Sequence, residues 1–100
     1  MRLIAAGTLA TYAAQQPGAA AALNHWRQMI KAADWKDMND LRAAASTAKV
    51  LNGERVRFEV AGGRFRLIAS INFNRAIVFV KFVGTHQEYD RVEALTVSLY

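Results

Sequence analysis

The chain has 100 residues, a length that fits one domain with a single modest core. It has no cysteine, which excludes disulfide bonds and thiolate metal sites, and no apolar run long enough to predict a membrane-spanning helix. The formal net charge is +5, and residues 49–86 carry all of it, which favours a polyanion or an acidic protein as a partner.

The first half of the chain has mostly helical spacing, after a short edge strand expected over residues 2–5. Thr8 is expected to cap a first helix that ends near Gln16, and Pro17 stands where a second helix would begin. Asp37 is expected to cap a short third helix. The apolar residues of the second helix recur at spacings of three and four, which predicts one buried stripe. They are Leu23, Trp26, Ile30 and Ala33.

After Gly53 the apolar residues alternate, as is typical of β-strands. Strands are expected over residues 55–60, 64–73 and 76–83, and Gly62-Gly63 predicts a hairpin turn between the first two. Helices followed by hairpin-linked strands predict an α+β fold in one domain spanning residues 1–100. We expect two layers, with the N-terminal helices packed on a C-terminal antiparallel sheet of about three to four strands.

Four arginines fall on the expected hairpin, Arg55 and Arg57 on one strand and Arg64 and Arg66 on the next. Residues two apart on a strand share a face, so the face away from the helices is expected to gather up to four guanidinium groups if the register pairs them. Guanidinium groups bind phosphate through paired hydrogen bonds, so phosphate is the natural ligand. The alternative is that Arg55 and Arg57 form ordinary surface ion pairs with Glu59 and with acids of the helices.

The stretch GTHQEYD, from Gly84 to Asp90, follows an apolar strand directly. Gly84 is expected to permit a sharp exit from that strand. His86 can transfer a proton near neutral pH, and a turn would bring Tyr89 close to it. An imidazole and a phenol in a basic cleft suffice for metal-free cleavage of RNA, whereas the alternative is a purely structural histidine. Glu88 and Asp90 are expected to hold His86 or to cap a turn.

Several short motifs are shared with one family. They are R-V-x-F before the glycine turn, F-R-L on the next strand and F-V-G-T-H-x-E-Y-D, together with R-x-I-A and KAADWK nearer the N-terminus. With these motifs, roughly residues 2–94 resemble HigB-type toxins of bacterial type II toxin–antitoxin systems. Phe65 stands where that family commonly has tyrosine, so no phenol is expected to act there.

The resemblance implies a RelE-like fold and an endoribonuclease that cleaves translated mRNA at the ribosome and arrests growth. It also implies a cognate helix-turn-helix antitoxin of the HigA type, with operator DNA bound only through the complex of the two proteins. No cofactor and no metal site are expected. By position, the matching motifs place Arg64, Arg66, His86 and Tyr89 in the catalytic site. The chemistry of imidazole and phenol, rather than the resemblance, assigns proton transfer to His86.

The basic segment supplies the remaining candidates for RNA binding, which are Lys49, Arg55, Arg57, Arg75 and Lys81. A cytoplasmic location without a membrane partner is expected, because Gly7, Thr8 and Thr11 break the apolar run at the N-terminus and no signal peptide is predicted. The alternative function is a non-catalytic basic module that binds RNA or the antitoxin. The final residues, LTVSLY, alternate like a strand. The sequence is compatible with two alternatives, in which this segment either folds back onto the domain or contacts a partner.

Overall fold

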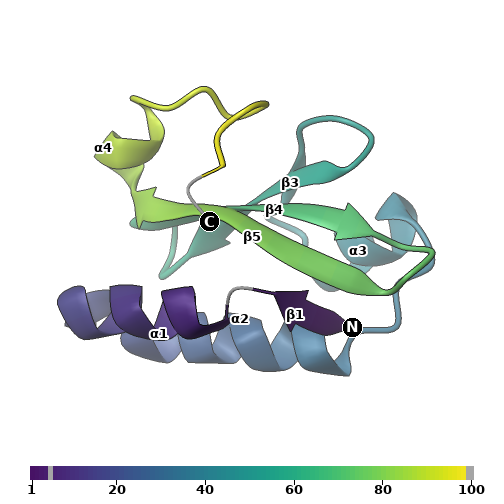
Figure 1. Ribbon diagram of the computed structural model, residues 1–100, viewed down its shortest axis with the longest axis horizontal. Coiled ribbons are helices and arrows are strands. Elements are labelled where there is room, and N and C mark those ends of the chain that lie inside the picture. Colours follow the sequence, from purple (N-terminus) through teal and green to yellow (C-terminus); the bar gives the residue numbers. More distant parts are fainter. Residues whose placement is uncertain (5, 99–100) are drawn as a thin grey trace.

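The computed structural model of the protein describes residues 1–4 and 6–98, which fold into two main layers (Figure 1). Within these residues the strands form a five-stranded sheet in the order β1-β5-β4-β3-β2. The helical elements are α1 (Ala6–Gln15), η1 (Pro17–Ala19), α2 (Ala20–Ala32), α3 (Met38–Ala44) and α4 (His86–Tyr89). The strands are β1 (Arg2–Ile4), β2 (Lys49–Val50), β3 (Arg55–Val60), β4 (Phe65–Asn72) and β5 (Ile77–Thr85).

The expected α+β fold is confirmed, but the sheet is larger than expected and is mixed. Strands β2 to β5 are antiparallel neighbours, whereas β1 pairs with β5 in the parallel direction. The extra strand, β2, has only two residues, which is too short to leave an alternating pattern in the sequence. None of the helices described is long and apolar enough to cross a membrane.

The helix starts agree with expectation only in part. Helix α1 begins at Ala6, so the expected cap at Thr8 is wrong, and Pro17 opens the 3₁₀ turn η1 rather than α2. Asp37 does cap α3, because its carboxylate accepts a hydrogen bond of 3.0 Å from the backbone N–H of Asp40. The carboxylate thereby satisfies one of the donors that the first turn of a helix leaves unpaired.

The core lies between α1, α2 and one face of the sheet (Figure 1). Trp26 of α2 meets the ring of Phe58 edge-on at 5.4 Å, so the expected helical stripe packs on β3. Each such buried side chain contributes about 1.5–3 kcal/mol. The buried core-facing residues of the sheet are Val56, Phe58, Val60, Phe65, Leu67, Ala69, Ile71, Val78, Val80 and Val83.

The opposite face of the sheet was expected to be open, and this is wrong for its middle. Ile68 and Phe82 belong to that face, yet only 0% and 3% of their surfaces are exposed. Helix α4 and the C-terminal segment, residues 90–98, lie over this face (Figure 1). Arg55 ties the segment down by donating to the carbonyl oxygens of Ala94 (3.2 Å) and Val97 (2.7 Å).

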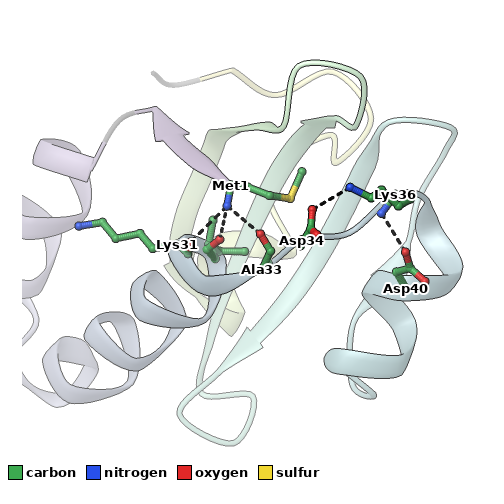
Figure 2. A network of polar contacts seen from close by, with 7 residues as sticks. Met1, Lys31, Ala33, Asp34, Lys36 and Asp40 are labelled. Carbon is green, nitrogen blue, oxygen red and sulfur yellow. Dashed lines mark hydrogen bonds and ion pairs between the residues drawn. The ribbon is translucent and has the colours of Figure 1, made fainter.

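The start of β1 is anchored to the end of α2, as Figure 2 shows. The amine of Met1 donates to the carbonyl oxygens of Ile30 (3.0 Å), Lys31 (3.3 Å) and Ala33 (2.9 Å). The last carbonyls of a helix have no partner within it and carry partial negative charge, so a cation is favourable there. This contact joins the helical layer to the β1 edge of the sheet.

Candidate functional site

Helix α4 has four residues, too few to be stable on their own, and a capping box fixes it at the end of β5. The Thr85 hydroxyl accepts from the backbone N–H of Glu88 at 3.1 Å, and the Glu88 carboxylate accepts from the backbone N–H of Thr85 at 2.8 Å. The same carboxylate accepts from the hydroxyl of Tyr12 on α1 at 3.4 Å. Glu88 therefore caps the turn, as expected, and also ties it to the helical layer.

Gly84 was expected to permit a sharp exit of the chain from its strand, and this is wrong. Its lack of a side chain instead allows Phe82 and Glu88 to approach the backbone closely. Gly84 lies inside β5 and is not among the glycines with positive φ. A Cβ atom at this position would lie 2.6 Å from the Cζ atom of Phe82 and 3.2 Å from the Cβ atom of Glu88. The absence of a side chain lets α4 sit tightly against the end of its own strand.

His86 is held at both its backbone and its ring. Its backbone N–H donates to the carbonyl oxygen of Arg64 at 3.1 Å, and its ring Nδ1 lies 3.2 Å from Oδ2 of Asp90. About half of each of these two side chains is exposed, 51% for His86 and 58% for Asp90. Asp90 therefore orients the imidazole, as expected, and leaves Nε2 as the ring nitrogen available for a substrate.

His86 lines a pocket of about 400 Å³ at the end of the sheet. Arg64 lines the same pocket, with its guanidinium carbon 5.7 Å from the centroid of the Phe65 ring. The guanidinium also approaches η1, because one of its nitrogens would lie 3.5 Å from a Cβ placed on Gly18. The full lining is Gln16, Arg64, Phe65, Thr85, His86 and Gln87.

Tyr89 lies on the sheet side of α4. Its ring centroid is 5.9 Å from the guanidinium carbon of Arg57 and 5.3 Å from that of Arg66, and it also packs near Phe82 at 6.3 Å. Within the described part of the chain, the Nε atoms of both arginines are buried without a hydrogen-bond partner. The ring is a further electrostatic partner of both guanidinium groups, in cation–π contacts of the usual length.

The expected cluster of four guanidinium groups does not form. Arg64 belongs to the turn before β4 and extends toward η1, so it does not share a face with Arg66. Arg55 is only 9% exposed and is engaged by the C-terminal carbonyls. Arg57 lies 3.7 Å from the carboxylate of Glu59, so the alternative of an ordinary ion pair holds for that residue. Alternation predicts a shared face only inside a strand, and here the strand begins one residue later.

The remaining basic candidates are more dispersed. Lys49 is exposed on the edge strand β2, and Lys81 sits at a register shift of β5 with its amine 5.6 Å from the Phe79 ring centroid. Arg75 lies in the turn that precedes β5, whereas α4, with His86, follows the other end of that strand. Strand β5 is roughly 26 Å long at about 3.3 Å per residue. Arg75 and His86 are therefore at opposite ends of the sheet.

Two residues of this region were missed by the sequence reasoning. Tyr12 and Gln16 come from the first helix and its end, about seventy positions before GTHQEYD, and no local pattern links them to it. Across residues 1–4 and 6–98, no three or more His, Asp or Glu side chains are grouped so as to hold a metal ion.

Comparison with known proteins identifies the class. The family model of HigB toxins, described as the RelE-like toxic component of a toxin–antitoxin system, matches residues 19–92, and the chain belongs to this family. It is also 32% identical over 95 residues to the mRNA interferase HigB of Escherichia coli O6:H1 (strain CFT073). That alignment covers 92% of this chain and 91% of the relative. The resemblance seen in the sequence motifs is thereby confirmed at the level of the family.

Proposed function

We propose that this toxin is an endoribonuclease that acts on translated mRNA at the ribosome, without a metal ion, and thereby arrests growth. Family membership supports the toxin role, and the name of the relative, mRNA interferase, supports RNA as the target. One observation carries the proposal: a single capped turn bears both His86 and Tyr89, between Arg64 on one side and the pair Arg57 and Arg66 on the other.

In the proposed reaction, Nε2 of His86 takes the proton of a ribose 2′-hydroxyl. The 2′-oxygen then attacks the neighbouring phosphorus, and the bond from phosphorus to the 5′-oxygen breaks. The 5′-oxygen takes a proton from a water molecule, and the imidazolium returns its own proton to the hydroxide so formed. The products are therefore a 2′,3′-cyclic phosphate and a free 5′-hydroxyl, with neutral imidazole regenerated. Arg64, which lines the pocket with His86, stabilises the negative charge that develops on the phosphate, and Asp90 keeps the imidazole oriented. Arg66, on the other side of α4, binds the adjoining phosphate of the same strand.

Tyr89 is proposed to contact the scissile phosphate or to stack on a base. Base–aromatic stacking contributes about 1–3 kcal/mol per base, and the guanidinium groups of Arg57 and Arg66 beneath the ring would attract the RNA backbone. Contacts to flanking RNA are proposed for Lys49, Lys81, Arg55 and Arg75. For Arg55, a phosphate would have to replace the carbonyl oxygens that the guanidinium now binds.

The partners follow from the family. A toxin of this class implies an antitoxin, and we propose one of the helix-turn-helix HigA type that covers the basic surface around α4. Binding to operator DNA would then occur only through the complex, because the basic groups described here would be occupied. The proposed location is the cytoplasm, where message and ribosomes are found.

A second candidate is a non-catalytic module that binds RNA or antitoxin, and one observation favours it. His86 is half exposed and, among residues 1–4 and 6–98, pairs with one carboxylate, an arrangement that also suits a surface histidine with no chemical role. The two candidates differ in what they do to RNA rather than in how they bind it.

The test uses the two histidines of the chain. RNA 5′ ends are mapped in cells that express the wild type, His86→Ala or His25→Ala, with growth followed in parallel and folding checked by circular dichroism. His25 is exposed on α2 and serves as the matched control. We expect new RNA ends and growth arrest with the wild type and His25→Ala, and neither with folded His86→Ala. A folded wild type that generates no new ends would favour the non-catalytic module.

A further inference from the structure

The pocket beside His86 contains two glutamines whose amide groups the proposed reaction does not use. Gln16 follows the end of α1, and Gln87 lies on α4 next to His86. Both residues are exposed, and within the described residues neither side-chain amide has a hydrogen-bond partner. The pocket volume of about 400 Å³ falls within the range of about 300–1,000 Å³ typical of small-ligand sites.

The pocket lining has the chemistry of a nucleotide site. Arg64 supplies a cation for a phosphate group, and an amide offers a donor and an acceptor side by side, the arrangement with which glutamine reads the edge of a base. Unstacked bases of single-stranded RNA are recognised in this way, by hydrogen bonds to their exposed edges. Neither lysine nor a carboxylate lines the pocket to compete for the amides.

We propose that this amide pocket, lined by Gln16, Arg64, Phe65, Thr85, His86 and Gln87, binds the base of the nucleotide next to the bond that is cut. Gln16 and Gln87 are then residues that determine sequence specificity. The position of the base relative to the cut rests on the proposed ribonuclease function, whereas binding of a nucleobase in the pocket does not. Tyr89 and the two arginines around it lie on the other side of α4, where they meet the adjoining backbone.

The consequence for cleavage is a base preference that depends on two amides. Loss of a good pair of hydrogen bonds to a base reduces discrimination by about 1–3 kcal/mol, which corresponds to roughly fivefold to 150-fold at about 1.4 kcal/mol per factor of ten. We therefore expect wild-type cut sites to favour a particular base at one fixed position, and Gln16→Ala and Gln87→Ala to flatten that preference. Gln87→Glu keeps the size but only accepts hydrogen bonds, so it should shift the preference toward bases whose edge donates.

The first experiment sequences the RNA 5′ ends produced in cells by the wild type and by these variants. Gln15→Ala is the control, because Gln15 is an exposed neighbour on α1 that does not line the pocket. A preference that Gln15→Ala keeps and that Gln16→Ala and Gln87→Ala lose supports the proposal. A wild type without any base preference, or a preference unchanged in both pocket variants, would overturn it.

The second experiment needs no cleavage, so it separates this proposal from the proposed function. Nucleoside 5′-monophosphates with each of the four bases are titrated into the protein, and the side-chain amide resonances of the glutamines are followed by NMR. We expect shifts for Gln16 and Gln87 with at least one base, and none for Gln15 or Gln28. Ribose 5-phosphate is the control without a base. Equal shifts with ribose 5-phosphate would mean a phosphate site only, and absence of shifts with all four nucleotides would rule out base binding.

Discussion

Helix α4 separates two basic surfaces that are built differently. On its pocket side, His86 and Arg64 face a hollow closed by residues of the helical layer, and the polar groups there are exposed. On its sheet side, Tyr89 packs over Arg57 and Arg66, whose side chains are half-buried. One short turn therefore presents residues three positions apart to two different surroundings, His86 to the exposed pocket and Tyr89 to the half-buried arginines.

The largest effect on RNA cleavage is expected from removing the imidazole on the pocket side of α4. His86→Ala should lower the rate of RNA cleavage by about 10²–10⁴-fold, the usual contribution of general acid–base catalysis. Affinity for RNA should change little, because the sheet side remains intact. Single-turnover cleavage and a binding titration on the same ribosome-bound message measure the two quantities separately. A loss of affinity as large as the loss of rate would show that His86 binds rather than reacts.

The sheet side is tested through binding. Arg66→Ala should weaken RNA binding by roughly 10- to 100-fold, because hydrogen bonds to charged groups contribute about 1.5–3 kcal/mol. The salt dependence of binding should also become less steep, since one phosphate contact is lost. Arg42→Ala, on the exposed side of α3, removes the same charge and serves as the control. If both variants weaken binding equally, net charge rather than the site explains the effect.

A substitution at Gly84 tests how closely α4 must pack on the end of β5, and its effect is expected on stability. Gly84→Ala would place a Cβ at 2.6 Å from Phe82 and 3.2 Å from Glu88, so the end of β5 or α4 has to move. We expect a loss of about 1–3 kcal/mol in the free energy of unfolding, the usual cost of overpacking, measured by urea denaturation. Gly53→Ala is the control, because open space surrounds that position. Equal stability of the two variants would contradict the close approach.

The smallest effect is expected at the cap. Thr85→Ala removes the hydroxyl that accepts from Glu88 and should cost about 1 kcal/mol of stability, whereas Thr85→Ser keeps the oxygen and should cost less. Because α4 has four residues, the loss should be local, and amide hydrogen exchange of residues 86–90 should rise more than that of β4. Uniform faster exchange across the sheet would indicate global destabilisation instead.

Much of the fold was predictable from the sequence because the spacing of apolar residues and the positions of capping and turn residues are local properties. The helical stripe with Trp26, the cap at Asp37 and the turn at Gly62-Gly63 were all confirmed. The strand β2 and the parallel pairing of β1 were less visible, because two or three residues carry no period.

The candidate site was predictable only as a list of residues. The sequence indicated that Glu88 and Asp90 would hold His86 or cap a turn, since such contacts span three or four positions, but the structure was needed to show that Glu88 caps and Asp90 holds. The separation of Arg64 from Arg66 depends on where β4 begins, a boundary that alternation alone does not define. The contribution of Gln16 depends on how the helical layer docks, which is a long-range property. The catalytic and RNA-binding roles stay predictions.

Arg55 holds the C-terminal segment through main-chain oxygens, which every amino acid possesses. This contact therefore places no demand on the side chains at positions 94 and 97. Relatives are free to substitute those positions during evolution and still trace the same path, provided that an arginine occupies the position of Arg55. In an alignment of the family such a segment would look unconstrained, although a distant arginine holds two of its carbonyl oxygens. We expect insertions there to be selected against more strongly than substitutions, because an insertion shifts the carbonyls away from the guanidinium group.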